Sequence, residues 1–234
     1  MVRGVVVVSG TGTEVGKTVV TAGLAACALR AGLRVAVLKP AQTGVREGEP
    51  GDVAEVRRLA GSEVTGVELG RFPDPLAPAT AARRAGLPYV TPRQVAEAAG
   101  KLAAGHDLVL VEGAGGLLVR FDGDGGTLAD AAGMLAAPVV VVAEAGLGTL
   151  NATALTAEAL RGRGLACAGV VIGCWPSEPG LAERCNVAEL GVVAGAPLGG
   201  VVPSGVGGLA SGAFRRAAPG WFVRGLGGAA GAFG

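Results

Sequence analysis

The sequence is poor in the side chains that most metal sites and nucleophilic enzymes use. It holds one histidine, His106, which excludes a multi-histidine metal site and leaves little room for a Ser-His-Asp triad. Its four cysteines, Cys27, Cys167, Cys174 and Cys185, show no CxxC pair or other zinc-like spacing. We therefore expect ordinary thiols and a structural histidine.

Charge and hydropathy indicate neither a nucleic-acid nor a membrane partner. The formal net charge is +1, which gives no basic face and no acidic tail. Half of the residues are hydrophobic, yet no apolar run is long enough to span a bilayer, and Val5–Val8 is too short for a signal-peptide core. These features predict a soluble cytoplasmic protein.

Lysine is also scarce, and its scarcity makes each position informative. Among 20 basic residues the only lysines are Lys17, Lys39 and Lys101. Arginine cannot replace lysine where a compact ammonium must fit between phosphates or approach a reacting centre. Lys17 and Lys39 lie next to small residues beside predicted strand ends, which makes them candidates for such roles.

Short apolar strands alternate with helices along most of the chain. The expected strands are Val5–Val8, Arg34–Leu38 (ended by Pro40), Asp107–Val111, Pro138–Ala143, Ala168–Ile172 and Leu198–Val202. The expected helices are Thr18–Ala31, Val53–Ala60, Pro92–Ala104, Thr127–Ala136, Asn151–Arg161 and Leu181–Leu190. This alternation predicts an α/β fold: a single-domain, doubly wound, mostly parallel sheet with helices on both faces and ligands at one edge.

Two segments are expected to hold little regular structure. Thr43–Pro92 is rich in glycine and proline and is interrupted only by the Val53–Ala60 helix. Gly225–Gly234 is mostly glycine and alanine, and we expect it to be frayed. The predicted domain is therefore 1–224, followed by a tail over 225–234.

The segment Ser9–Thr18, read as SGTGTEVGKT, follows the first strand and opens the first helix. Its spacing, Gly10-x5-Gly16-Lys17-Thr18, departs from the usual GxxxxGK[ST] pattern by one residue. Small residues still let backbone N–H groups turn toward phosphate oxygens, and the helix N-terminus adds its dipole. The segment predicts a phosphate-binding loop, in which Lys17 reaches the terminal phosphates and the Thr18 hydroxyl binds Mg²⁺.

Acidic and basic side chains follow the next two strands at the same edge. Lys39 could be a solvated strand end, but lysine scarcity favours a role in neutralising charge as a phosphoryl group leaves. Glu112 is followed by glycines that allow close approach of metal and phosphate. Asp52 could supply another Mg²⁺ contact, cap the Val53 helix, or do both. Asn151, after the fourth strand, is either a plain N-cap or part of a carboxylate site at a helix N-terminus.

These pieces, in this order, resemble the dethiobiotin synthetase family within the P-loop NTPases. The resemblance is carried by Gly10–Thr18, Lys39-Pro-x-x-Thr-Gly, Val111-Glu-Gly-Ala-Gly-Gly116, Leu147–Asn151 and Pro203, which span almost the whole chain. It implies an ATP- and Mg²⁺-dependent cyclo-ligase that joins 7,8-diaminononanoate and CO2 through a carbamate and a carbamic–phosphoric anhydride. It also implies a homodimer.

The resemblance assigns roles by position. Lys39, with Lys17, would be catalytic, and Thr18, Asp52 and Glu112 would be the Mg²⁺ ligands. Substrate would be contacted by Thr43, Leu147, Gly148, Thr149, Leu150 and Asn151, the last five in the family across a two-fold interface. The nucleotide would lie on Thr13, Glu14, Val15, Gly16, Lys17, Thr18, Val19, Asp52, Glu112, Gly113, Ala114, Gly115, Gly173, Cys174, Pro203, Ser204 and Gly205.

The chain departs from the family at the adenine-reading position. Many members carry Asn-Asp where this chain has Gly173 and Cys174. Neither side chain can make a bidentate hydrogen-bonded contact to a base. We therefore expect relaxed base selectivity, so that other nucleoside triphosphates could replace ATP.

Two other functions share this ATPase core. A switch ATPase of the septum-positioning or plasmid-partitioning kind usually carries a further lysine early in the loop, and Gly10–Thr13 has none. A cobyrinate-amidation synthetase normally continues into a glutaminase domain, for which this sequence leaves no room. Both remain alternatives to the synthetase.

Overall fold

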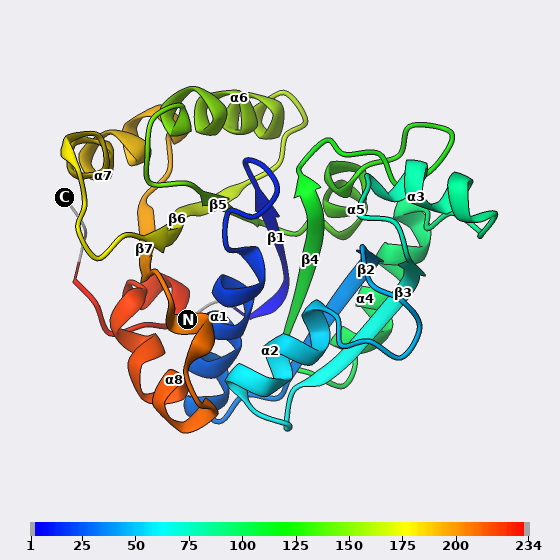
Figure 1. Cartoon of the computed structure of the whole chain (residues 1–234), viewed down its shortest axis with the longest axis horizontal. Coiled ribbons are helices and arrows are strands. Elements are labelled where there is room, and N and C mark those ends of the chain that lie inside the picture. Colours follow the sequence, from blue (N-terminus) through cyan, green and yellow to red (C-terminus); the bar gives the residue numbers. More distant parts are fainter. Residues whose placement is uncertain (1–2, 232–234) are drawn as a thin grey trace.

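The computed structural model describes residues 3–231 as a sheet of seven strands between layers of helices (Figure 1). The strands are β1 Gly4–Gly10, β2 Val35–Thr43, β3 Thr65–Phe72, β4 Leu108–Gly116, β5 Val139–Ala143, β6 Cys167–Trp175 and β7 Leu198–Pro203. The α-helices are α1 Lys17–Arg30, α2 Asp52–Ala60, α3 Pro78–Ala85, α4 Pro92–Ala103, α5 Leu128–Leu135, α6 Thr149–Arg161, α7 Leu181–Ala194 and α8 Ser211–Ala217. Short 3-10 turns cover Val206–Gly208, Ala218–Trp221 and Arg224–Leu226.

The strand order is β3-β2-β4-β1-β5-β6-β7, and every described pair is parallel. The chain builds one half of the sheet with β1 to β4, where β4 returns to lie between β1 and β2, and the other half outward from β5 to β7. The order therefore reverses at β1, where the crevice at the carboxyl edge is open to ligands. The predicted doubly wound α/β fold is confirmed, and the sheet is wholly parallel among the described strands.

Valine alternation in the central strands divides the core into two layers. In β1, Val6 and Val8 join the cluster formed with α1, α2 and α8, whereas Val7 joins the cluster formed with α3, α4 and α5. Successive strand side chains point to opposite faces, so an all-valine run buries both. A third cluster packs α6 and α7 against β6. No helix of residues 3–231 is long and apolar enough to cross a membrane.

Strand β2 continues through Pro40, which the sequence analysis expected to end it. Pairing with β4 ends at Leu38, and from there β2 pairs only with β3, up to Thr43. Proline is tolerated where a strand has become an edge, because its missing N–H then removes no bond from the ladder. The extra residues bring Gln42 and Thr43 to the ligand edge.

The stretch expected to be irregular, Thr43–Pro92, contains both β3 and α3. β3 is an edge strand that contains two glycines and is only half-buried over most of its length, so its sequence shows no continuous apolar run. Its structure comes from pairing with β2 rather than from its own pattern. Residues after β3 consequently lie at the ligand edge too.

Two helix starts also differ from expectation. α6 begins at Thr149 with Gly148 as its N-cap, so Asn151 lies inside the first turn instead of capping it. α2 begins at Asp52 with Gly51 as its N-cap, so Asp52 is not the cap either. α4 begins as expected at Pro92, and the Thr91 hydroxyl caps it by accepting the Gln94 N–H.

Part of the tail expected to be frayed contacts the body of the protein. Leu226 is buried in the core, and the Ala230 N–H donates to the Phe222 carbonyl at 3.0 Å. Residues 232–234 lie outside the described part of the chain.

Candidate active site

The loop between β1 and α1 curls around the ammonium group of Lys17. Lys17 Nζ donates to the Gly12 carbonyl oxygen at 2.8 Å. No side chain caps α1, and its first turn carries no acidic residue. A helix start without a cap leaves backbone N–H groups for a ligand, and the helix dipole favours an anion there.

The end of β6 closes against this loop through backbone alone. Gly16 adopts a left-handed φ of 94°, and a Cβ there would lie 2.5 Å from the Gly173 carbonyl oxygen. A Cβ at Gly173 would overlap the Val15 carbonyl in return. Both positions therefore require glycine, so Gly173, at the predicted adenine-reading position, is a point of close backbone contact.

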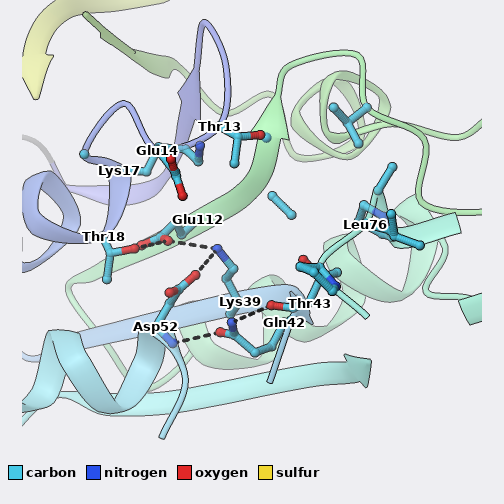
Figure 2. Close-up of a pocket in the computed structure, with 18 of the residues that line it drawn as sticks. Thr13, Glu14, Lys17, Thr18, Lys39, Gln42, Thr43, Asp52, Leu76 and Glu112 are labelled. Carbon is cyan, nitrogen blue, oxygen red and sulfur yellow. Dashed lines mark hydrogen bonds and ion pairs between the residues drawn. The ribbon is translucent and has the colours of Figure 1, made fainter. Parts of the chain in front are cut away.

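Lys39 joins three elements at the floor of the site, as Figure 2 shows. From β2, its Nζ donates to Glu112 Oε1 at 2.9 Å and to the Gly113 carbonyl at 3.0 Å, both on β4. The same nitrogen lies 2.5 Å from Asp52 Oδ2 at the start of α2. Thr18 Oγ1 donates to Glu112 Oε1 at 2.9 Å, which links the network to α1. The sequence-predicted Lys39, Asp52, Glu112 and Thr18 are thus brought together.

Burial and charge act differently on the two lysines. Burial disfavours the ammonium of Lys39, but the adjacent Glu112 and Asp52 carboxylates outweigh it and raise its pKa. For Lys17, burial and the nearby Lys39 charge lower the pKa to about 8, against the opposing pull of Glu112 and Asp52. Lys39 is therefore held firmly as a cation, whereas the Lys17 ammonium would be stabilised by an anionic ligand.

The donor set fits a divalent cation that is shared with a ligand. Glu112 is only 1% exposed, and its Oε2 has no hydrogen-bond partner among the described residues. A buried carboxylate oxygen without a partner is costly unless a cation or ligand meets it. Within residues 3–231 no three His, Cys, Asp or Glu side chains are placed to hold a metal by themselves. Two carboxylates and a hydroxyl suit Mg²⁺, which usually takes its remaining ligands from water and phosphate.

These groups lie in a cavity of about 700 Å³ between β2, β4 and the loop (Figure 2). Its walls include half of the predicted site residues: Thr13, Glu14, Gly16, Lys17, Thr18, Val19, Lys39, Thr43, Asp52, Glu112, Ala114 and Gly115. Sequence reasoning missed a further wall made of Gln42, Gly44, Pro75, Leu76, Ala77, Pro78 and Val119. The carboxyl-edge rule would have placed Pro75–Pro78 here if β3 had been recognised.

Other predicted contacts form two separate groups. Pro203–Gly205 lies beside the end of β6, where the Ser204 N–H donates to the Trp175 carbonyl at 2.7 Å. Gly173 and Cys174 belong to the same strand end, so the two predicted base-side segments are neighbours. Leu147–Asn151, at the start of α6, does not line the 700 Å³ cavity.

Comparison with known proteins identifies the relatives of this arrangement. Residues 4–205 match the AAA domain family. The chain is 66% identical over 224 residues to the ATP-dependent dethiobiotin synthetase BioD of Streptomyces avermitilis, covering 96% of this chain and 94% of that one. It is 71% identical over 201 residues to the BioD of Saccharopolyspora erythraea, covering 86% and 88%.

A solved structure, the septum site-determining protein MinD of Pyrococcus horikoshii with Mg-ADP, matches with a TM-score of 0.59 at 20% identity. It covers 94% of this chain and 95% of that one. At that identity the likeness shows the fold alone. The two BioD relatives, 66% and 71% identical to this chain over most of their length, show more: this chain belongs to the ATP-dependent dethiobiotin synthetase family.

Proposed function

We propose that the chain forms dethiobiotin from 7,8-diaminononanoate, CO2 and ATP, releasing ADP and phosphate. The observation that carries this proposal is the Lys39 ammonium, bonded to Glu112 and Asp52 in one cavity with the phosphate-binding loop. A fixed cation beside both a metal-type carboxylate pair and the phosphates suits a reaction between two anions, a carbamate and a triphosphate. The family relationship supplies the substrates.

The reaction needs positioning and charge neutralisation more than a protein nucleophile. CO2 adds to one amine to give a carbamate, whose oxygen attacks the γ-phosphorus while ADP leaves. The second amine then attacks the carbonyl carbon of the anhydride, phosphate leaves, and the ureido ring closes with loss of a proton. No histidine or cysteine lines the described cavity, in keeping with such a route.

Each charged side chain then has one task. Lys17 binds the terminal phosphates, and Lys39 neutralises the carbamate and the phosphoryl group in transfer. Thr18, Asp52 and Glu112 would hold Mg²⁺, which would screen the phosphate charges. With Glu112 and Asp52 holding Mg²⁺, the Lys39 ammonium would be free to face the reacting oxygens.

The remaining assignments belong to the same proposal. Gly173–Cys174 and Pro203–Gly205 would border the base, Thr43 would contact the diamine, and Leu147–Asn151 would bind its carboxylate end. We propose a homodimer in which that last segment serves the partner's cavity. A cytoplasmic location remains a prediction.

A direct assay tests the function. Protein, Mg²⁺, ATP, bicarbonate and 7,8-diaminononanoate are mixed, and phosphate and dethiobiotin are measured by colour reaction and mass spectrometry. We expect equal amounts of both products and almost no phosphate without the diamine. Phosphate release at the same rate with and without the diamine would indicate a switch ATPase instead.

A further inference from the structure

A buried asparagine holds the loop in front of α6 from a neighbouring helix. Asn186 lies on α7 and is 6% exposed. Its Nδ2 donates to the Ala145 carbonyl at 2.8 Å and to the Gly146 carbonyl at 3.0 Å. Both hydrogens of the side-chain amide are therefore bonded to the carbonyl oxygens of two successive residues in the β5–α6 loop, some forty residues earlier in the chain.

A third carbonyl of the same loop is tied down from its other side. Thr149 Oγ1, in a residue only 1% exposed, donates to the Glu144 carbonyl at 2.7 Å. Carbonyls 144, 145 and 146 thus all end on side-chain donors inside the protein. Because C=O and N–H point in opposite directions across a trans peptide, fixing these carbonyls also fixes where the following N–H groups point.

Those N–H groups are left without partners. Among the described residues no acceptor is placed for the N–H of Gly146 or Leu147, which share their peptides with the Ala145 and Gly146 carbonyls. Gly148, the N-cap of α6, offers no side chain, and Leu147 is 87% exposed. The helix therefore begins with outward N–H groups in a fixed array, whose orientation is set from behind by Asn186.

We infer that Asn186 is a positioning residue for the carboxylate end of the substrate. The inference rests on the proposed function, in which Leu147–Asn151 binds that carboxylate. Without the Asn186 amide, the Ala145 carbonyl loses its donor and the Gly146 carbonyl keeps only the Thr149 N–H at 3.4 Å, so the loop turns both carbonyls toward water. The N–H groups that face the carboxylate then lose their common direction, while the phosphate loop and Lys39 are untouched.

The test compares Asn186→Leu with the wild-type enzyme on two substrates. With 7,8-diaminononanoate we expect KM to rise at least about tenfold, since hydrogen bonds to a charged group are among the stronger ones, while kcat and KM for ATP stay within twofold. With 2,3-diaminononane, which has a methyl group in place of the carboxylate, the two proteins should have the same KM. Calorimetric binding of each diamine gives the same comparison without turnover.

Two further variants separate positioning from general loss of stability. Val187→Ala, the next residue of α7, removes packing against the α6–α7 core but no loop hydrogen bond, and should leave both KM values unchanged. Asn186→Gln keeps the two amide donors one methylene further out. This variant should fold, and its KM for 7,8-diaminononanoate should rise less than that of Asn186→Leu. An equal rise with both diamines, or none with either, would overturn the inference. A wild-type enzyme that makes no dethiobiotin would instead overturn the proposed function.

Discussion

At the scale of single residues, the site is organised by one cation among carboxylates. Lys39 is 3% exposed and contacts Glu112, which is 1% exposed, so both charges were moved out of water together. Such a pair persists because each partner compensates the other, and removing one leaves a buried charge. The same arrangement that prepares the chemistry therefore also contributes to the fold.

Replacing Lys39 with alanine should reduce both the activity and the stability of the protein. We expect Lys39→Ala to abolish dethiobiotin formation and to destabilise the metal-free protein by about 3 kcal/mol, because Glu112 keeps its charge without a cation. Mg²⁺ should recover part of that loss by binding the freed carboxylates. Urea unfolding with and without Mg²⁺ measures the stability. Near-normal turnover, or a loss of stability that Mg²⁺ leaves unchanged, would refute this role.

The base side of the site gives a second prediction at this scale. Because Gly173 offers no side chain to read a base, kcat/KM for ATP, CTP and GTP should agree within about tenfold, less than a bidentate base contact usually discriminates. Gly173→Asn should not restore adenine selectivity. Its Cβ would overlap the Val15 carbonyl and displace the loop, which weakens binding of all three nucleotides.

Gly208→Ala serves as the matched control, because a Cβ there meets nothing within 4 Å. Its nucleotide affinities should equal those of the wild type. Strict dependence on ATP in the wild-type enzyme would contradict the first part of the prediction. A selective and fully active Gly173→Asn variant would contradict the second.

Sequence could predict most of the charged residues of the site, because their meeting follows from topology. Lys39 and Glu112 lie toward the carboxyl ends of parallel strands, and Thr18 follows the loop after a third strand, so all three meet at one sheet edge. The role of Gln42 could not be predicted in this way. Its function depends on Gly51 and Asp52, to which no local pattern connects it.

At the scale of elements, the start of helix α2 is capped by a side chain from strand β2. Gly51 provides no side-chain acceptor, and instead Gln42 Oε1, from the end of β2, accepts the Asp52 N–H at 2.8 Å. Gln42 is 4% exposed, so this contact is protected from water. It anchors the helix start whose first side chain, Asp52, reaches Lys39.

Loss of this remote cap should disturb both stability and metal use. Gln42→Met keeps the length of the side chain but removes the acceptor, which should cost about 1 kcal/mol in unfolding free energy, as caps usually do. The freed start of α2 should also raise the Mg²⁺ concentration needed for half-maximal activity. Mn²⁺ binding followed by electron paramagnetic resonance gives the metal affinity independently of turnover.

Gln94→Met is the matched control, because Gln94 Oε1 accepts the Thr91 N–H at 2.9 Å in the capping box of α4, away from the site. It should cost a similar free energy with no change in Mg²⁺ dependence. If both variants left the metal requirement equal to that of the wild type, Gln42 would be a structural cap only.

The elements themselves were predictable to different degrees. Strands buried on both faces, such as β1 and β5, can be predicted from their continuous valine runs, because both faces of a central strand are covered by apolar side chains. β3 and the end of β2 did not, because an edge strand is held by backbone pairing that no side-chain pattern records. α3 was missed with them, and so was the wall of the cavity that Pro75–Pro78 supplies.

At the scale of the whole molecule, large apolar side chains remain exposed along α6 and α7. Leu155 on α6 is 58% exposed, Leu181 on α7 is 72% exposed, and Leu147 just before α6 is 87% exposed. These helices lie together at one end of the molecule, away from α3 (Figure 1). Single exposed leucines are ordinary, but several on adjoining helices indicate a contact surface.

We expect this surface to form the proposed homodimer, so the protein should sediment at twice its chain mass of 22.7 kDa. Leu155→Asp would place a charge in the dimer contact and should shift the protein to the single-chain mass. Because Leu147–Asn151 would serve the partner's cavity, the same variant should raise KM for 7,8-diaminononanoate more than KM for ATP. Leu87→Asp makes the same change at a leucine that is 44% exposed after α3, and it should stay dimeric with both constants unchanged. A wild-type protein that sediments as one chain at assay concentrations would show that the substrate site is complete within a single copy.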